Sequence, residues 1–368
     1  MTAEITDKIA TGKPASRRKP AAPRKPRRGR IKCIIWDLDG TLWDGVLLED
    51  DAVRVRPWVV EHIRRLDAMG VLHSIASKND RGAALDKLRD LGLDDLFLYP
   101  QINWNSKSSS VQLIAKALNL GLDAFAFVDD QEFERAEVGS VIPEATCVDV
   151  ASLDRELARP EFIPRFVTDE SAKRRQMYRA QITRDDLERD FVGTSDQFLA
   201  ELGLEFTIEP ARREDLQRAE ELTVRTNQLN ATGRTYSYAE LDELRKSPDH
   251  LLLVTSLTDK FGSYGKVGIA LVEKGSQEWH LRMLLMSCRV MSRGVGMVLL
   301  NHLMRLAADA GVQLRADFVE TGRNRMMQIT YAFAGFREVS RNGAEVMLAA
   351  DLTTVQPPPA YVRLEILG

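Results

Sequence analysis

Polar residues of several kinds stand where apolar segments of this sequence end. In chain order they are Asp37 and Asp39 after IKCIIW, Ser77 at the end of VLHSIA, Lys107 before VQLIAKAL, and Asp129 with Asp130 after AFAFV. Phosphoryl transfer needs a carboxylate nucleophile, a second carboxylate for proton transfer, a hydroxyl and a cation for phosphate oxygens, and carboxylates for a metal ion. Open α/β sheets bind ligands at the carboxyl ends of their strands, so this pattern predicts a phosphoryl-transfer site.

The segments that must position these residues alternate between short apolar runs and amphipathic stretches over residues 31–150. This alternation predicts an α/β domain with a parallel sheet wrapped by helices. Gly70, Gly92 and Gly121 each follow a helical pattern, where a glycine commonly ends a helix. The stretch before Ser77 has room for only a small flap and one helix, so no large cap domain is expected over the site.

A second domain with a different order of elements follows. Residues 151–202 are charged and mostly helical in pattern, with breakers at Pro160 and Pro164, and are expected to connect the domains. Residues 203–352 show an α+β order, in which a strand and two helices precede three strands, a helix, a strand, a helix and closing strands. Residues 353–368 are expected to form a C-terminal tail.

The composition is that of an ordinary globular protein. The 368 residues are 44% hydrophobic and 29% charged, with a formal net charge of -3, and suffice for two cores. Residues 1–30 are rich in Pro, Ala, Arg and Lys and are expected to be a disordered basic arm. The arm is either a solvated tail or a docking segment for an acidic protein, and nucleic acid is not expected as a partner.

Hydropathy and cysteine content bear on the compartment. No apolar run is long enough to cross a bilayer, and the N-terminus lacks the apolar segment of a signal peptide, so a cytoplasmic location without membrane contact is expected. Cys33, Cys147 and Cys288 are too few and too scattered for a disulfide framework or for paired metal ligands. Any functional cysteine must therefore act singly, and Cys33 is expected to pack in the core.

The first domain resembles haloacid-dehalogenase (HAD) phosphatases, because DxDGT, Ser, Lys and Asp-Asp match the four motifs of that family in their usual order. The resemblance implies that Asp37 is the nucleophile and becomes aspartyl-phosphate, and that Asp39 is the general acid and base. Ser77 and Lys107 would hold the phosphoryl oxygens. The resemblance implies a Mg²⁺ site made by the Asp37 carboxylate, the Asp39 carbonyl, Asp129 and Asp130. Further substrate contacts are expected from Thr41 and Asn79.

The second domain resembles GCN5-related (GNAT) acetyltransferases. The segment RGVG at 293–296 stands between a strand and a long helix, where glycines let backbone N–H groups approach a pyrophosphate. Asn324, followed by Tyr331 and then by GF, is similar to the GNAT signature. The groove is expected to hold the phosphopantetheine arm of a carrier protein, which is chemically the same as part of coenzyme A. The residues expected along it are Arg289, Arg293, Gly294, Gly296, Asn324 and Tyr331.

The chain from about Ile31 to Ala349 resembles FkbH-like proteins, because it carries in order DLDGTLWDGVLLED, SKND, INWNSKS, FVDDQEFERAEV, RTNQLNATGR, FGSYGKVG and LLMSCRVMSRG. The resemblance implies transfer of a glyceryl unit from 1,3-bisphosphoglycerate, with dephosphorylation, to the phosphopantetheine thiol of an acyl carrier protein in polyketide biosynthesis. Mg²⁺ is the implied cofactor, and the carrier protein and 1,3-bisphosphoglycerate are the implied partners.

Two groups near the expected groove have open interpretations. Cys288 ends LRMLLMSCRV beside Arg289 and is either an acyl-carrying nucleophile or a packed strand residue. The polar helix end RTNQLN contains Arg225, Asn227 and Asn230. These residues either bind glyceryl hydroxyls or a phosphate, or serve only in capping and in the loop.

Two other functions remain open from the sequence. One is a HAD phosphatase of a small phosphorylated metabolite with a conventional coenzyme A-dependent N-acetyltransferase domain. The other is a scaffold whose basic arm docks a partner, although a complete set of phosphoryl-transfer motifs argues against it.

Overall fold

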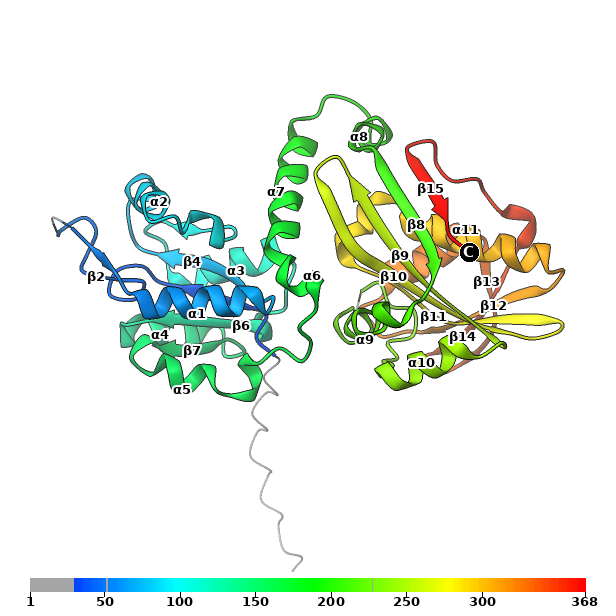
Figure 1. Cartoon of the computed structure of the whole chain (residues 1–368), viewed down its shortest axis with the longest axis horizontal. Helices are drawn as coiled ribbons and strands as arrows, with labels where there is room; N and C mark the ends of the chain where they lie inside the picture. Colours follow the sequence, from blue (N-terminus) through cyan, green and yellow to red (C-terminus); the bar gives the residue numbers. More distant parts are fainter. Residues whose placement is uncertain (1–29, 51, 227) are drawn as a thin grey trace, which may run out of the picture.

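The computed structural model describes residues 30–50, 52–226 and 228–368. The arm expected at residues 1–30 therefore lies, apart from Arg30, outside the described residues, as does Asn227. Two domains lie side by side, with helix α7 (Arg174–Asp190) between them (Figure 1). Within the described part of the chain, no helix combines the length and the apolar character needed to cross a membrane.

The first domain contains a five-stranded parallel sheet in the order β5-β4-β1-β6-β7. Its strands are β1 (Cys33–Trp36), β4 (Leu72–Ser77), β5 (Gln101–Ile102), β6 (Phe125–Asp129) and β7 (Thr146–Asp149). β1 lies in the centre, and all four of its residues are buried. A continuous apolar run is what a strand needs when helices cover both faces of its sheet.

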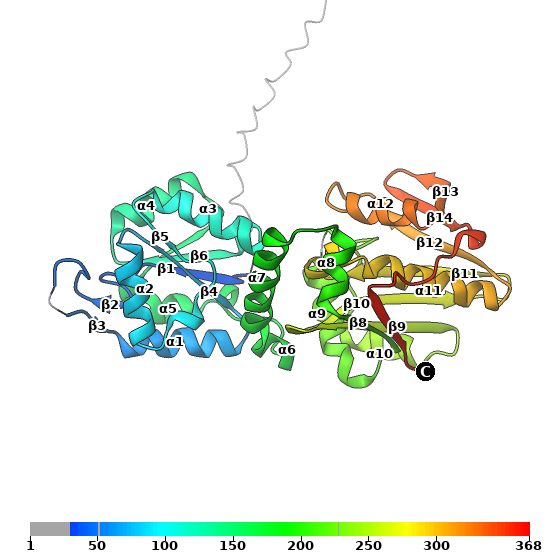
Figure 2. The same ribbon diagram turned by 90° about the horizontal axis from the view of Figure 1, so that it is seen from above.

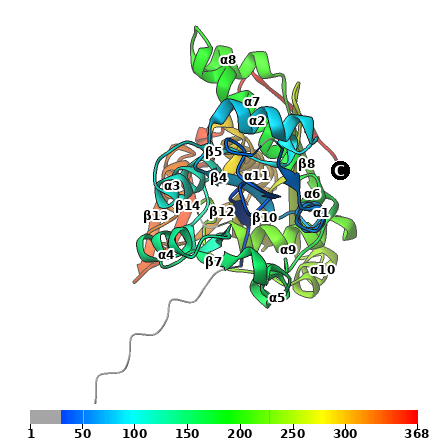
Figure 3. The same ribbon diagram turned by 90° about the vertical axis from the view of Figure 1, so that its left-hand side faces the viewer.

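Helices cover both faces of this sheet (Figure 3). On one face pack α1 (Pro57–Ala68), α2 (Arg81–Asp90) and α5 (Leu153–Leu157), and on the other α3 (Lys107–Leu118) and α4 (Glu132–Val141). The insertion between β1 and α1 is a small hairpin of β2 (Trp43–Asp44) and β3 (Arg54–Val55). The predicted HAD-like Rossmannoid domain without a large cap is confirmed.

The helix ends agree with the glycine pattern in two of three places. Gly70 and Gly92 follow α1 and α2 in the left-handed conformation, with φ of 82° and 62°. After α3 the prediction is wrong, because Asn119 takes that conformation with φ of 51° and Gly121 has φ of -66°. Asn tolerates the left-handed region better than other residues with a side chain, so it can end the helix earlier.

The second domain contains an eight-stranded sheet in the order β13-β14-β12-β11-β10-β9-β8-β15. Its strands are β8 (Leu204–Pro210), β9 (His250–Asp259), β10 (Gly262–Lys274), β11 (Glu278–Met286), β12 (Gln313–Val319), β13 (Phe336–Asn342), β14 (Glu345–Ala350) and β15 (Val362–Ile366). On one face pack α9 (Leu216–Arg225) and α10 (Tyr238–Lys246), and on the other α8 (Ser195–Leu202), α11 (Val295–Asp309) and α12 (Arg325–Phe333). The predicted α+β GNAT-like fold is confirmed.

Two segments belong to the second domain although the sequence analysis places them outside it. α8, expected in the connecting segment 151–202, buries Phe198 and Leu199 in the core of the second domain. β15, within the expected tail 353–368, pairs in parallel with β8. The reason is that β15 covers the backbone edge of β8, and an uncovered edge strand is an aggregation hazard.

Helix α7 contacts both domains. Tyr178 and Ile182 pack against the core of the first domain. Arg184 donates two hydrogen bonds of 2.7 Å to Asp259 at the end of β9, and its guanidinium lies 3.9 Å from the ring centre of Tyr264. The side chains of Arg184 and Asp259 are 1% and 0% exposed. This buried ion pair ties the helix to the second domain.

We expect Arg184→Ala to lower the free energy of unfolding by about 3–5 kcal/mol, because it leaves the Asp259 carboxylate buried without its partner. The exposed Arg189, on the same helix, is the matched control. Its replacement by alanine should change stability by less than about 0.5 kcal/mol. Denaturant unfolding measures both. Equal effects of the two substitutions would show that the Arg184 ion pair does not hold the helix.

Candidate active site

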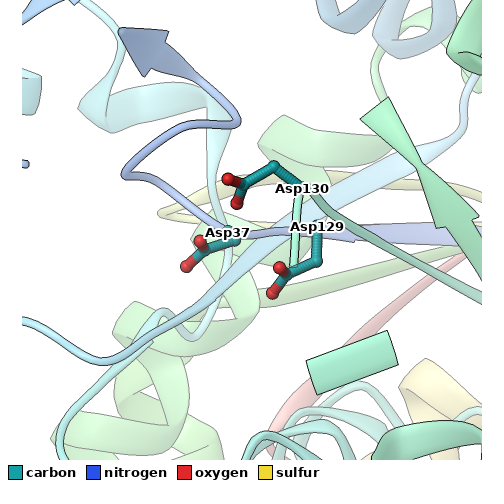
Figure 4. A group of neighbouring side chains, drawn as sticks. All are labelled: Asp37, Asp129 and Asp130. Atoms are coloured by element: carbon teal, nitrogen blue, oxygen red, sulfur yellow. The ribbon is translucent and has the colours of Figure 1, made fainter. Parts of the chain in front are cut away.

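Three carboxylates meet where β1 and β6 end (Figure 4). Asp37, Asp129 and Asp130 bring one oxygen each within 4.8 Å of the others. Asp37 follows β1 directly and Asp129 ends β6, its parallel neighbour, in which Val128 is level with Trp36. Because parallel strands present their carboxyl ends at one edge of the sheet, residues far apart in the chain converge there.

Lys107 lies between two of these carboxylates. Its Nζ is 2.6 Å from Asp37 Oδ1 and 2.9 Å from Asp129 Oδ2, and none of the three side chains is more than 5% exposed. Lys107 is the first residue of α3, whose N-terminus is capped by the hydroxyl of Ser106. One ammonium faces three carboxylates, so negative charge is in excess. An all-oxygen set with this excess suits a hard divalent cation.

The buried charges change the acidity of the site. Burial raises the pKa of Asp37 to about 6, although Lys107 acts against this and Asp129 adds to it. The Ser77 hydroxyl gives Asp37 a hydrogen bond, which lowers the pKa. Burial also raises the pKa of Asp129. For Lys107, the lowering of the pKa by burial is outweighed by Asp37 and Asp129, so the pKa is raised and the side chain stays charged.

Asp39 is held by groups of the first domain and is not one of the three clustered carboxylates. Oδ1 accepts hydrogen bonds from the Trp43 indole at 2.7 Å and from the Leu47 amide at 3.2 Å. Oδ2 accepts one from the Asn79 side chain at 2.9 Å. Asn79, expected to contact a substrate, therefore positions Asp39. Trp43, which the sequence analysis did not select, does the same.

Thr41 and Gly40 position Asp130. Thr41 is fully buried, and its hydroxyl oxygen accepts a hydrogen bond of 3.0 Å from the Asp130 amide, so it supports a carboxylate rather than facing a substrate. Gly40 has φ of +68°, and a Cβ at this position would lie 2.4 Å from Asp130 Oδ2. Both the backbone conformation and the close approach of Asp130 require glycine here.

A gap between two strands of the second domain is filled by the chain itself. β11 and β12 are paired only as far as Leu281 and Ala316 and then diverge. Residues 229–231 lie between the diverging strands and hydrogen-bond to both. The bonds are Ala231 N to Leu284 O at 2.9 Å, Met286 N to Leu229 O at 2.8 Å, and Val319 N to Ala231 O at 2.9 Å.

Two residues expected along the pantetheine groove, Asn324 and Tyr331, are buried in this arrangement, as is Asn230, for which binding of glyceryl hydroxyls or a phosphate was one interpretation. Asn230, Asn324 and Tyr331 are 1%, 2% and 1% exposed. The Asn324 amide donates to the carbonyls of Asn230 at 3.1 Å, Ala231 at 3.3 Å and Val319 at 2.8 Å. The structure thus corrects the expectation, since Asn324 holds the inserted segment in place and Tyr331 packs in the core.

The glycine loop before α11 also faces its own chain. Arg293 is fully buried, with Nη1 3.2 Å from Glu188 Oε2 and its guanidinium 5.8 Å from the Phe198 ring. A Cβ at Gly294 would lie 2.7 Å from the Tyr361 hydroxyl, and a Cβ at Gly296 would lie 3.7 Å from Met286 Cγ of β11. The contacts of Arg293 and Gly294 support packing rather than the expected ligand contacts.

Cys288 lies outside the packed sheet. It begins the 3₁₀ turn Cys288–Arg293 directly after β11 and is exposed, so the interpretation as a packed strand residue is wrong. Cys33, in contrast, is fully buried as expected. Burial raises the pKa of Tyr178 on α7, Cys288 raises it further, and Arg289 and Arg225 lower it. Arg289 Nη1 lies 2.8 Å from Met177 Sδ of α7, and Arg225 bonds to the same carboxylate, Glu221, as Arg174 of α7, so the turn that begins at Cys288 and the end of α9 both lie next to α7.

Three of the solved structures that are similar to this chain illustrate the comparison, each with low overall similarity. One is the N-terminal part of a Bacteroides fragilis protein containing a phosphatase domain complexed with Mg, at 28% identity and a TM-score of 0.30, over 33% of this chain and 36% of that chain. Another is the ribosomal-protein-S18-alanine N-acetyltransferase of Escherichia coli, at 21% identity and a TM-score of 0.32. The similarity covers 39% of this chain and 92% of that chain. A third is the PaiA N-acetyltransferase of Thermoplasma acidophilum in complex with coenzyme A, at 15% identity and a TM-score of 0.33. The similarity covers 39% of this chain and 98% of that chain.

No family model matches the sequence, and the comparison with curated proteins finds no match. The chain spans about a third of the length of the phosphatase structure. The assignment of both folds follows from the strand orders and helix layers described above.

We expect Mg²⁺ or Ca²⁺ to raise the melting temperature of the protein, and Asp129→Asn to remove most of this shift, because it takes away one buried ligand atom. At about 100 times the dissociation constant, a bound cation stabilises the fold by about 2.7 kcal/mol. Asp86→Asn, on the exposed side of α2, is the control and should keep the shift.

The cation effect should shrink as the pH falls through about 6, because protons then compete for Asp37. In the cation-free protein, stability changes with pH in the opposite direction. The pKa of Asp37 lies above its ordinary value, so its ionisation between about pH 4 and pH 6 costs stability as the pH rises. A cation effect that is independent of pH, or that survives Asp129→Asn, would contradict this site.

Proposed function

We propose that this protein loads a glyceryl unit from 1,3-bisphosphoglycerate onto the phosphopantetheine thiol of an acyl carrier protein in the cytoplasm, and removes a phosphate in the process. The observation that carries the proposal is that one chain presents a buried aspartate nucleophile beside a lysine and, at the domain junction, an exposed thiol among cations. The resemblance to FkbH-like proteins supplies the substrate, the carrier protein and the link to polyketide biosynthesis.

In the proposed phosphatase step, Asp37 Oδ attacks the phosphorus of a phosphate ester, and the alkoxide leaves with a proton from Asp39. Lys107 and Ser77, which already contact Asp37, hold the phosphoryl oxygens. Water then attacks the phosphorus of the aspartyl-phosphate while Asp39 takes its proton, the bond between phosphorus and Asp37 Oδ breaks, and inorganic phosphate leaves as the Asp37 carboxylate is restored. The carboxylates of Asp37, Asp129 and Asp130 would hold Mg²⁺, which neutralises phosphate charge when bound.

In the proposed acyl-transfer step, the Cys288 thiolate attacks the carbonyl carbon of the acyl phosphate. A carbon–sulfur bond forms, the carbon–oxygen bond to phosphate breaks, and inorganic phosphate leaves. The pantetheine thiolate then attacks the enzyme thioester, and the Cys288 thiolate leaves. Thioester exchange is nearly isoenergetic, so alignment of the two sulfurs supplies most of the rate.

The two sites lie near opposite ends of β1. β1 starts next to α7 and runs away from the second domain, and the β2–β3 hairpin that follows Asp39 lies on the far side (Figure 2). Lys32, on the junction side of β1, lies five positions before Asp37. At about 3.3 Å per residue these five steps span about 17 Å. A substrate tethered to a carrier protein by a flexible arm can visit both sites, which favours a carrier-bound intermediate.

A conventional coenzyme A-dependent acetyltransferase is a weaker candidate. The GNAT resemblance places its cofactor along Arg293, Asn324 and Tyr331, and these residues are 0%, 2% and 1% exposed. The thiol at the junction would have no use in direct transfer from acetyl-coenzyme A to an amine.

Asp37→Asn should lower phosphate release about a thousandfold or more, since an amide is not a nucleophile and also weakens the metal site. Release from 4-nitrophenyl phosphate and from phosphoglyceryl-carrier protein measures this. Asp44→Asn, in the exposed part of the neighbouring hairpin, should release phosphate at the wild-type rate. Undiminished release by Asp37→Asn would exclude this phosphatase site.

Cys288→Ala should eliminate both the acylated enzyme and the loaded carrier protein, because the thioester step loses its nucleophile. Intact-protein mass spectrometry of a mixture with 1,3-bisphosphoglycerate, Mg²⁺ and carrier protein detects both species. Hydrolysis of 4-nitrophenyl phosphate should persist, and Cys147→Ala should load the carrier normally. Loading by Cys288→Ala at the wild-type rate would instead indicate direct transfer to the carrier.

A further inference from the structure

Three arginines converge on one buried carboxylate at the domain junction. The Glu221 side chain, on α9, is 0% exposed. It accepts hydrogen bonds from Arg174 of α7 at 2.6 Å, and from Arg218 and Arg225 of its own helix at 2.6 Å and 2.8 Å. Arg218 also forms an ion pair with Glu170 of α6 (Asp169–Ala172) at 2.6 Å. Three guanidinium groups therefore share two carboxylates.

Two further cations add to this surplus. Among the described residues, Arg289 donates hydrogen bonds to neutral groups, Met177 Sδ at 2.8 Å and Ser287 Oγ at 3.4 Å. Lys32, just before β1 of the first domain, forms no ion pair among the described residues. Asp123 is the carboxylate among the largest influences on the pKa of Lys32. The five cations Lys32, Arg174, Arg218, Arg225 and Arg289 are thus set against the carboxylates of Glu170, Glu221 and Asp123, while the nearby Lys266 is paired with Glu209 and Asp215.

The cations oppose one another electrostatically. Burial lowers the pKa of Arg174 to about 10, and Arg225 lowers it further. Burial lowers the pKa of Arg289, and Arg218 adds to this. Burial and then Arg225 lower the pKa of Lys32. Keeping surplus positive charge out of water is costly unless an anion compensates it.

The Cys288 thiol lies beside these cations. Arg289 follows it in the chain, and Arg289 Nη1 lies 2.8 Å from Met177 Sδ of α7, the helix that also carries Arg174. Arg174 Nη1 donates a hydrogen bond of 2.7 Å to Gly70 O, and the Leu72 amide donates one of 2.9 Å to Lys32 O, so Lys32 lies on the same side of the junction. Cys288 is exposed, and Arg225, Arg289 and Lys32 are partly exposed, so both the thiol and the cations are accessible to a ligand. Arg174 and Arg218, whose side chains are only 11% and 10% exposed, add positive charge behind them.

We propose that Lys32, Arg225 and Arg289 form a phosphate-binding site across the two domains, which holds a small phosphorylated acid with its carboxyl carbon at the Cys288 thiol. A phosphate dianion compensates surplus positive charge, and guanidinium groups bind phosphate by paired hydrogen bonds. In acyl transfer the same cations stabilise the negative charge that develops on the departing phosphate. This inference rests on the proposed function for the reaction, but the binding site can be tested without it.

The site differs from the Asp37 centre in position and in charge. Lys32 precedes the amino end of β1 and Asp37 follows its carboxyl end. Only the junction site uses residues of both domains, so it requires the domains to stay docked through α7. In this site Arg225, from the segment RTNQLN, has a ligand-binding role.

The test is the rate at which neutral iodoacetamide alkylates Cys288 in the full-length protein, followed by peptide mass spectrometry at constant ionic strength. We expect 3-phosphoglycerate and inorganic phosphate to slow alkylation, and glycerate at the same concentration to have little effect. Coenzyme A serves as a second probe, because its phosphates resemble those of the phosphopantetheine arm of a carrier protein. Protection by coenzyme A but not by 3-phosphoglycerate would assign the cations to the carrier arm and overturn the proposal.

Single substitutions in each of the two domains test which residues bind the phosphate. Arg289→Gln and Lys32→Gln should each weaken protection by 3-phosphoglycerate about tenfold, the loss expected for one charge-assisted hydrogen bond. Arg289→Lys should restore part of it. Arg337→Gln removes one exposed positive charge from β13 and should leave protection unchanged. Melting curves confirm that each variant is folded, and unchanged protection in folded Arg289→Gln and Lys32→Gln would overturn the proposal.

The outcomes separate this inference from the proposed function. If 3-phosphoglycerate protects Cys288 through Lys32 and Arg289 but no carrier protein is loaded, the binding site stands and the glyceryl-transfer function fails. If the carrier is loaded through Cys288 while protection and loading are indifferent to both substitutions, the function stands and the binding site fails.

Discussion

The Lys107 ammonium lies between the carboxylates of Asp37 and Asp129, and the organisation of the first domain brings these three groups together. Two carboxylates in a buried position repel each other and lose hydration, so they need a cation held in a fixed place. The parallel register of β1 and β6 aligns the two aspartates, and the capped N-terminus of α3 supplies the lysine. The excess of negative charge that remains makes this edge of the sheet suited to a divalent cation.

The opposite end of the same sheet shows the reverse imbalance. There the surplus is positive, it gathers around Glu221, and it lies against an exposed thiol. The hydrophobic strand β1 separates the two clusters, so their charges do not cancel. α7 contributes to the junction through Arg174 and ties the domains together through Arg184, which makes the relative placement of the domains part of the chemistry of the second cluster.

The positions of the first-domain residues could be predicted because strand ends are visible in the sequence. An apolar run that stops at a carboxylate places that residue at the sheet edge, and parallel topology brings such edges together. The supporting contacts could not be predicted in this way. Thr41 binds the amide of Asp130, and Asn79 binds Asp39 across forty residues. Such pairs depend on which loops meet, and a polar residue near a site looks the same in sequence whether it contacts a ligand or a neighbour.

The sequence by itself determined the two folds, their order, and the strand ends that carry Asp37, Ser77 and Asp129, because hydrophobic periodicity and motif spacing are local properties of the chain. Only the tertiary structure decided that residues 229–231 fill the space between β11 and β12, that β15 completes the second sheet, and that Lys32 joins Arg225 and Arg289 beside Cys288. These features depend on contacts between segments up to about 250 residues apart. They form because of packing and the balance of buried charge, and both of these depend on several segments of the chain at once.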